Sequence, residues 1–428
     1  MDRGYRGEAL TSFRANGPLC GRQLTVAFFC MPEAGHFQRL RPLISGLTRS
    51  GIAAHVFTHG KFRPQVERAG GIFFDLFSKY PLELADDESL PVPCRFVTFA
   101  GRYAEQIRRD ADKIQPSLVI HDTFAVIGRV IAGLLGIPRV NVCAGHNLAP
   151  ARFLAVLRED PRVKISPRCL HAVDVLRESY GLADASPFSY VSSLSPHLNV
   201  YCEPPEFLDE GERHAFEPIA FYGSLPSLEE DMGDKRGDRS GFGSDSARKF
   251  KVYVSFGTVV WRYYAADAIR ALTALAAALG EIDNVQVVIS LGGARIGREA
   301  LAALALPNAS VESCVDQWRI LQEADAFLTH HGMNSTHEAI FHRVPMISYP
   351  FFWDQPGLAG KCQRLGLAIP LTESLRGDFG KDHVHAVLAK LASEREAMRA
   401  ALSRAHEWER AVIDSRPAVH KRIIDLIE

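Results

Sequence analysis

The chain has 428 residues, of which 47% are hydrophobic, and it carries 49 basic and 50 acidic side chains. This length exceeds what one ordinary core fills, and it predicts two domains of about 200 residues each. The balanced charge argues against nucleic acid or an anionic membrane surface as the main partner.

The eight cysteines are scattered and form no Cys-x-x-Cys pair, so neither a disulfide framework nor a structural zinc site is predicted, and a reducing cytoplasm fits best. Residues 1–22 are mixed in charge, rich in Gly and Arg, and lack an apolar core of signal-peptide length. We expect them to form a flexible N-terminal extension. The most apolar window, residues 126–142, is interrupted by arginine and proline, which argues against stable membrane insertion.

Apolar runs of strand length alternate with helical patterns after the extension. Strands are predicted at residues 24–30, 53–58, 72–76, 117–120, 138–142, 198–202 and 219–222. This order is typical of a doubly wound parallel sheet, so residues 23–224 are predicted to be one Rossmann-like α/β domain.

Residues 225–250 form the clearest break in composition. This segment is rich in Gly, Ser and charge and has almost nothing to bury, so a flexible linker is predicted. A second series of strands is predicted at residues 251–256, 285–290, 310–314, 326–329 and 344–349. Residues 251–428 are therefore predicted to be a second Rossmann-like domain, whose last part, residues 382–428, is helical and breaks at Pro417.

Two titratable residues follow strands of the first domain, at the edge where open α/β sheets bind ligands. His36 follows the first strand, and the positive end of a helix dipole there favours a neutral imidazole that can accept a proton. Asp122 follows strand 117–120, and a carboxylate on the far ring nitrogen would fix the tautomer. The alternative is that both residues are ordinary cap and turn residues.

The segment 316–356 carries most of the candidate ligand-binding residues of the chain. Strand 326–329 is followed by a tight turn at Gly332 and by a helix predicted to begin near Ser335. A helix N-terminus presents unpaired N–H groups and the positive end of a dipole, so this turn suits a phosphate. Acceptor and amide groups nearby suit a hydroxyl-rich ligand; they belong to Glu338, Asp354 and Gln355.

Simpler interpretations of the same residues stay open. Ser335 and Glu338 also match a capping box, and Asp354 ahead of a proline matches a helix cap. His337 and His342 are five residues apart, which places them on different helix faces, so no metal site is expected.

Residues 144–195 are predicted to form short amphipathic helices that could line a pocket or simply cover the core. A partly aromatic pocket for a hydrophobic small molecule is predicted from a set of mainly aromatic residues, each of which could instead belong to the core. These candidates are Phe74, Phe96, Phe124, His146 and Phe153.

The segment 316–356 resembles the donor-binding signature of the nucleotide-sugar-dependent glycosyltransferases with the GT-B fold, the family that includes plant secondary-metabolite and bacterial macrolide glycosyltransferases. The signature is matched by Gln317, His330, Gly332, Asn334, Ser335, Glu338, Val344-Pro345, Pro350 and Asp354-Gln355. Ser255, Gly257 and Thr258 resemble the second-domain loop beside the phosphate site. The strand, Gly35-His36 and a helix with Pro42 resemble the opening motif, and Asp122 matches the partner aspartate.

The resemblance implies that His330, Asn334 and Ser335 hold the diphosphate, that Glu338 holds the ribose and that Asp354 and Gln355 hold the sugar. It also implies that the terminal helices cross back onto the first domain.

Two departures stand out in the sequence. His331 replaces a second small residue, and Cys314, next to Val315, replaces the tryptophan that stacks on the base in many relatives, which leaves uracil versus thymine open. A third departure, Arg343 before Val-Pro, is minor.

The prediction is therefore an inverting glycosyltransferase that moves a hexose from a UDP- or dTDP-sugar to a hydroxyl of a hydrophobic, natural-product type acceptor. His36 is the predicted base, with no metal and no tightly bound cofactor, in a monomer or homodimer. One alternative is a nucleotide-sugar epimerase of similar fold. The other is a non-catalytic nucleotide-sugar-binding or activator subunit.

Overall fold

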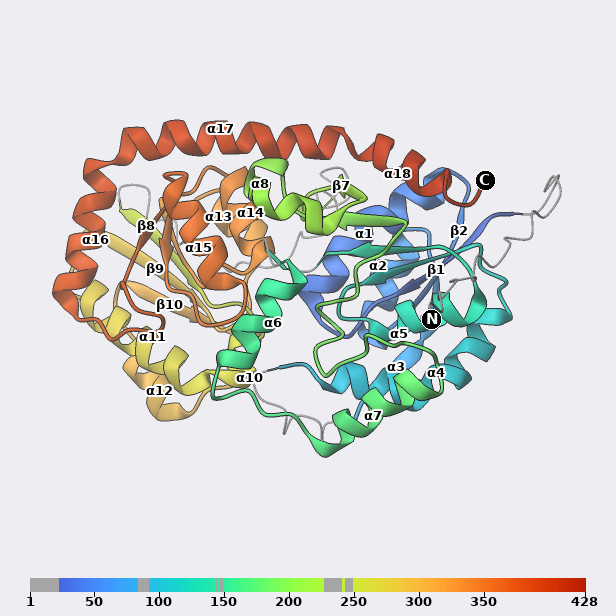
Figure 1. Cartoon of the computed structure of the whole chain (residues 1–428). Coiled ribbons are helices and arrows are strands. Elements are labelled where there is room, and N and C mark those ends of the chain that lie inside the picture. The colour runs from blue at the N-terminus through green and yellow to red at the C-terminus, as the bar shows by residue number, and fades with distance from the viewer. Residues whose placement is uncertain (1–22, 84–91, 144, 147–148, 227–240, 243–248) are drawn as a thin grey trace, which may run out of the picture.

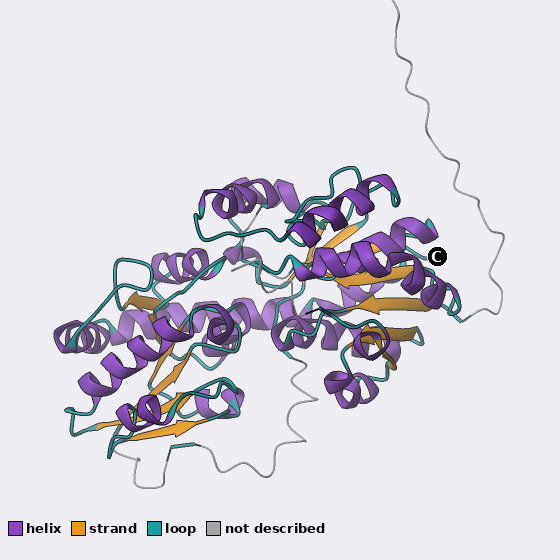
Figure 2. Ribbon diagram, turned by 90° about the horizontal axis from the view of Figure 1, so that it is seen from below, coloured by secondary structure: helices purple, strands orange, loops and turns teal. Residues whose placement is uncertain are grey.

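The computed structural model describes residues 23–83, 92–143, 145–146, 149–226, 241–242 and 249–428 (Figure 1). The predicted N-terminal extension and most of the predicted linker lie outside these residues. Two all-parallel sheets organise the chain, one of seven strands and one of six, and each forms its own α/β domain. Figure 2 shows their strands as two separate groups with helices around each.

The first sheet has the strand order β3-β2-β1-β4-β5-β6-β7. Its strands are β1 (Thr25–Phe29), β2 (Ala53–Thr58), β3 (Ile72–Asp75), β4 (Leu118–Asp122), β5 (Arg139–Val142), β6 (Leu198–Tyr201) and β7 (Ile219–Phe221). The second sheet has the order β10-β9-β8-β11-β12-β13. Its strands are β8 (Phe250–Ser255), β9 (Val285–Ser290), β10 (Ala309–Glu312), β11 (Ala326–Thr329), β12 (Met346–Ser348) and β13 (Ala368–Pro370).

The predicted doubly wound fold is confirmed, and every predicted strand is present with ends shifted by at most about two residues. Only β13 was not predicted, because its three residues are too few to show a period.

Helices connect the strands of both domains. In the first domain these are α1 (Ala34–Arg49), α2 (Arg63–Arg68), α3 (Leu76–Lys79), α4 (Arg95–Asp112), α5 (Val126–Leu135), α6 (Pro150–Glu159), α7 (Pro167–Glu178) and α8 (Glu210–Arg213). In the second part of the chain they are α10 (Val260–Tyr263), α11 (Ala265–Leu279), α12 (Arg298–Ala303), α13 (Gln317–Leu321), α14 (Met333–Phe341), α15 (Gln355–Arg364), α16 (Lys381–Ser393), α17 (Arg395–Asp414) and α18 (Arg416–Ile424).

Both faces of the first sheet are buried, which explains why its strands are nearly continuous apolar runs. Val26 and Phe28 of β1 belong to the core on the α1 side, whereas Ala27 and Phe29 belong to the core shared with α4 and α5. The α1-side core continues into the second domain, where it includes Phe327. The two domains therefore share buried apolar contacts as well as a chain connection.

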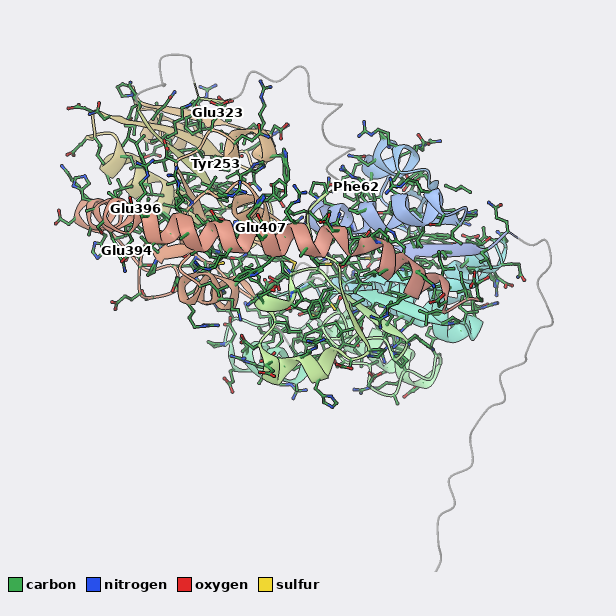
Figure 3. The ribbon with its side chains drawn as sticks, turned by 90° about the horizontal axis from the view of Figure 1, so that it is seen from above. Phe62, Tyr253, Glu323, Glu394, Glu396 and Glu407 are labelled. Carbon is green, nitrogen blue, oxygen red and sulfur yellow. The ribbon has the colours of Figure 1, made fainter. Side chains whose placement is uncertain are left out.

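The C-terminal helices run from the second domain onto the first. Figure 3 shows α17 from above, passing from Glu394 and Glu396 to Glu407, with α18 beyond it over the first domain. The Tyr222 hydroxyl, just after β7, is hydrogen-bonded to Nε2 of His420 on α18 at 2.7 Å. The break between the two helices falls at Ser415, two residues before Pro417 in the first turn of α18.

Gly128 in α5 lies where the helix touches β4 most closely. A Cβ atom at this position would overlap Cβ of His121, which is fixed to the strand backbone. We expect Gly128→Ala to lower the free energy of unfolding by about 1–3 kcal/mol, because α5 has to move away from the sheet. Urea unfolding measures this loss.

Gly133 in the same helix is the matched control, since a Cβ atom there has no neighbour within 4 Å among the described atoms. Gly133→Ala should raise the free energy of unfolding by about 0.5–1 kcal/mol through helix propensity alone. Equal effects of the two substitutions would contradict this packing of α5 on β4.

Candidate active site

A cleft of about 790 Å³ lies between the domains, at the carboxyl ends of the central strands of both sheets. The start of α1 lines it from the first domain. The loops after β8 and β11 and the starts of α14 and α15 line it from the second domain. Of the predicted donor residues, those that line the cleft are Ser255, Gly257, Thr258, Cys314, Val315, Gln317, His330, Gly332, Asn334, Ser335, Glu338, Asp354 and Gln355.

His36 and Asp122 form a hydrogen-bonded pair in this cleft. Nδ1 of His36 lies 2.8 Å from Oδ1 of Asp122, and the two residues are brought together because β1 and β4 are neighbours in the sheet. A carboxylate only accepts hydrogen bonds, so we assign the proton to Nδ1, which leaves Nε2 as the acceptor. The His36 side chain is 13% exposed, whereas the Asp122 side chain is 3% exposed. The pair can therefore take a proton from a group in the cleft.

An aromatic wall flanks this pair. The ring of Phe124 lies 4.3 Å from the ring of His36, and the indole of Trp353 lies 5.9 Å from Phe124. Trp353 lines the cleft from the second domain, and its Nε1 is buried with no partner within the described part of the chain. Trp353 was not predicted from the sequence, although its place directly before Asp354 was a usable signal.

The predicted aromatic pocket is only partly formed by its candidates. Phe124 and Phe153 line the cleft. Phe96 and His146 are almost fully buried and are not part of the cleft lining. Phe74 is half-buried, stacks near Phe57 and is not part of the cleft lining.

The turn at Gly332, predicted to suit a phosphate, connects a strand to a helix as expected. The helix α14 begins at Met333, however, two residues before the predicted start. Gly332 is the N-cap residue and no side chain caps the helix, so the capping-box alternative for Ser335 and Glu338 is wrong. Ser335 lies inside the first turn, where its hydroxyl lines the cleft. The exposed backbone N–H groups of this turn are suited to an anion.

His330 is held between two glycines at this turn. A Cβ atom on Gly257 would lie 2.6 Å from its Nε2, and one on Gly332 would overlap the same atom. Burial lowers the pKa of His330 to about 4, so the ring is neutral near pH 7. A neutral imidazole can still donate one hydrogen bond to a phosphate oxygen.

His331, the residue that departs from the small-residue pattern, does not face the cleft. It has a positive φ of 59°, which favours a residue without a large side chain. Its fully buried ring is hydrogen-bonded to Ser348 Oγ at 2.8 Å and to Thr336 Oγ1 at 3.3 Å. His331 therefore joins the end of β11 to β12 and to α14 beneath the turn.

Gln317 is hydrogen-bonded to Glu338, the predicted ribose-binding residue, and to two residues near it. Its Nε2 donates to Oε2 of Glu338 at 2.7 Å and to Oγ of Ser335 at 3.1 Å, and its Oε1 accepts from the Tyr253 hydroxyl at 3.3 Å. Gln317, the first residue of α13, therefore fixes the orientation of the Glu338 carboxylate. Cys314 is exposed at the same end of the cleft, and the other free cysteines within the described ranges are buried.

Asn334 contacts the first domain across the cleft. Its Oδ1 accepts from Nε of Arg39 at 3.0 Å, and its Nδ2 donates to the backbone carbonyl of Gly35 at 3.1 Å. Arg39 was not predicted from the sequence, although it lies one helical turn after His36 on the same face of α1. Asn334 therefore joins the two domains at the point where α1 and α14 begin.

Asp354 and Gln355 also have protein partners. Asp354 occupies the N-cap position of α15, as the helix-cap alternative predicted, but its side chain makes no capping hydrogen bond. Its Oδ2 instead accepts from the backbone N–H of His146 in the first domain at 3.0 Å. Burial raises the pKa of Asp354 above the usual range for a carboxyl group. Oε1 of Gln355 accepts from the backbone N–H of Phe351 at 2.9 Å, which leaves its amide nitrogen as the group for a ligand.

No group of three or more His, Cys, Asp or Glu side chains could hold a metal ion among the described residues. Asp110 and Asp112 form an Asp-x-Asp sequence, but both lie in α4, where the partners of Asp110 are Lys79, Tyr80 and Lys113. No helix within the described ranges is both long enough and apolar enough to span a membrane.

Comparisons with known proteins identify relatives in sequence and in structure. Residues 238–407 match the family model described as UDP-glucoronosyl and UDP-glucosyl transferase. An uncharacterized UDP-glucosyltransferase of Bacillus subtilis is 25% identical over 379 residues, covering 86% of this chain and 89% of that protein. The glycosyltransferase of kitacinnamycin has a similar structure with a TM-score of 0.74 and 21% identity, over 95% of this chain and all of the other. Spinosyn rhamnosyltransferase complexed with thymidine diphosphate also has a similar structure, with a TM-score of 0.62 and 20% identity, over 93% of this chain and all of the other.

The packing of His330 against Gly332 can be tested by substitution. Gly332→Ala places a Cβ atom against the imidazole, and we expect a loss of about 1–3 kcal/mol in the free energy of unfolding. Gly297→Ala is the matched control, because Gly297 is also a helix N-cap residue with φ of −64° and its Cβ atom would have no neighbour within 4 Å. It should change stability by less than about 0.5 kcal/mol. If Gly332→Ala is equally harmless in urea unfolding, His330 does not occupy this position.

Proposed function

We propose that this chain, a glycosyltransferase with the GT-B fold, is an inverting enzyme that moves a hexose from a nucleoside-diphosphate sugar to a hydroxyl of a hydrophobic natural-product type acceptor. The observation that carries this proposal is the His36–Asp122 pair in the same cleft as the N-terminus of α14. A base and an anion site that face one space are what a single displacement at a sugar carbon requires.

In this proposal His36 is the general base. Its Nε2 accepts the proton of the acceptor hydroxyl, whose oxygen attacks the anomeric carbon from the side opposite the leaving diphosphate. Asp122 holds the ring in the required tautomer and stabilises the imidazolium that forms. The bond from the anomeric carbon to the phosphate oxygen breaks in the same step, which inverts the configuration.

The leaving diphosphate needs positive potential at the place where its charge develops. The N-terminus of α14 supplies backbone N–H groups, and His330 and Ser335 add side-chain donors. Arg39 brings a guanidinium to the same place from the first domain, because it already reaches Asn334 at the start of α14. We include Arg39 in the proposed phosphate site for this reason.

The donor is proposed to lie along the second domain. Glu338, oriented by Gln317, accepts from the ribose hydroxyls, and Cys314 lies beside the base. Asp354 and the amide of Gln355 bind the sugar hydroxyls. The similar proteins include one named for UDP-glucose chemistry and one complexed with thymidine diphosphate, so both UDP- and dTDP-sugars are candidates.

The acceptor is proposed to lie on the aromatic wall formed by Phe124, Phe153 and Trp353, next to His36. Such a wall suits a flat, apolar molecule that carries a hydroxyl. The epimerase and the non-catalytic subunit considered from the sequence are not favoured, because the similar proteins are named as glycosyltransferases.

The base assignment predicts the behaviour of two variants. We expect His36→Ala and Asp122→Asn each to lower the rate of sugar transfer by about 10²- to 10⁴-fold, because the first removes the base and the second loses the charge that fixes its tautomer. Nucleotide affinity, measured by calorimetry, should stay the same, since neither residue is among those proposed to hold the nucleotide. His171→Ala, at an exposed histidine of α7, is the control. Full activity in His36→Ala would disprove this role.

The donor site predicts nucleotide-dependent stability. Binding at about 100 times Kd adds about 2.7 kcal/mol to the native state, so UDP or dTDP should raise the melting temperature, whereas GDP should have a smaller effect. Glu338→Ala should weaken UDP binding by about ten- to a hundredfold, because a carboxylate that accepts from hydroxyls is lost. The loss should be smaller for dTDP, which has no 2′-hydroxyl. No shift with any of the three nucleotides would contradict the proposed donor site.

A further inference from the structure

Four ionisable side chains form a buried cluster beside the cleft. His146 and Glu203 belong to the first domain, His337 to α14 and Glu409 to α17. None of them is more than 2% exposed. Burying charged groups is costly unless they are paired, so an arrangement of this kind requires a physical explanation.

His337 is at the centre of the cluster. Its Nε2 lies 2.9 Å from Oε1 of Glu203, and its Nδ1 lies 2.5 Å from Oε1 of Glu409. A neutral imidazole has one N–H group and could not donate to two carboxylates, so this geometry fits an imidazolium. Burial alone would lower the pKa of His337, but Glu409 and Glu203 outweigh burial and raise it to about 10.

Glu203 is anchored within the first domain. Its Oε2 lies 2.8 Å from Nδ1 of His146 and accepts from the Tyr201 hydroxyl at 3.1 Å. Burial would raise the pKa of Glu203, but His146 and His337 outweigh burial and hold it well below the usual range. The carboxylate therefore has fixed partners on both sides of the domain boundary.

The cluster is connected to both helices that carry the proposed donor site. His337 directly precedes Glu338 and lies one turn after Asn334 on α14. His146, the first-domain partner of Glu203, donates its backbone N–H to Asp354, the N-cap residue of α15. The starts of α14 and α15 are thus held to the first domain through one set of contacts.

We propose that His337 is a positioning residue for sugar transfer, which holds α14 against Glu203 so that the donor on the second domain stays in line with His36 on the first. This inference rests on the proposed function. A displacement of about 1 Å between reacting groups can reduce a rate by about a hundredfold, so a fixed contact at this boundary has a direct effect on rate. Buried ion pairs contribute little net stability compared with apolar packing, which favours a geometric role.

Two isosteric substitutions separate the interdomain contact from the rest of the cluster. Glu203→Gln removes the carboxylate in the first domain and leaves His337 paired with Glu409. Glu409→Gln removes the other carboxylate and leaves the pair with Glu203 across the boundary. Each variant therefore keeps one balanced ion pair, and both are expected to fold cooperatively.

We expect Glu203→Gln to lower kcat by at least about tenfold, with the Kd for UDP or dTDP within about threefold of the wild-type value. Glu409→Gln should keep kcat within about threefold. If the cluster had only a structural role, both substitutions would lower the melting temperature to a similar extent, and kcat would not differ between the two variants. Unchanged kcat in folded Glu203→Gln, or an equal loss in both variants, would overturn the proposal. If Glu203→Gln does not fold, Glu203→Asp, which draws the charge back by one methylene, should show the same loss.

Amide hydrogen exchange of residues 333–341 gives a readout that does not depend on activity. Glu203→Gln should speed exchange in α14 relative to Glu409→Gln, because the contact to the first domain is lost. If the wild type binds nucleotide but transfers no sugar, the proposed function fails and the exchange result alone decides the positioning role. Unchanged protection of α14 in Glu203→Gln would then refute it.

Discussion

The contact between the first turns of α1 and α14 is the constraint on which the candidate site depends. Two helix N-termini, one from each domain, point into the same cleft, and Arg39 adds a further positive charge. Asn334 bridges these like-charged ends with both atoms of its amide. A diphosphate placed there would neutralise a positive potential that the fold maintains in its absence. The same two helices carry His36 and Glu338, so one contact sets the distance between the proposed base and the proposed donor site.

Four histidines near this contact show how environment decides the use of one side chain. His36 is partly exposed and paired with a carboxylate, which suits proton transfer. His330 and His331 are buried without a carboxylate partner in the described structure, and burial lowers their pKa values to about 4 and about 3. His337 is equally buried, but two carboxylates keep it charged. Residue type alone would have assigned all four the same chemistry.

The fold and most of the cleft were predictable because they depend on local patterns. Apolar runs gave the strands, and the strand order of a doubly wound sheet placed His36 and Asp122 at neighbouring strand ends. The side-chain partners could not be predicted from the sequence in the same way. Asn334 contacts Gly35, which is 299 positions away in the chain, and Asp354 contacts His146, which is 208 positions away. A local pattern of residues contains no information on contacts over such separations. The start of α14 was misplaced because the Ser335–Glu338 spacing of a capping box also occurs inside a helix.

The chain crosses between the domains twice, once after Leu225 and once at the junction of α17 and α18, and the two crossings touch. Arg416, the first residue of α18, donates to the carbonyl of Leu225 at 2.6 Å. Two connections that are hydrogen-bonded to each other restrain the domains at this edge more tightly than either would alone. We infer that relative motion of the domains is smallest here. Because α17 is a continuous helix of 20 residues, about 30 Å long, it carries this restraint along the second domain as far as α16.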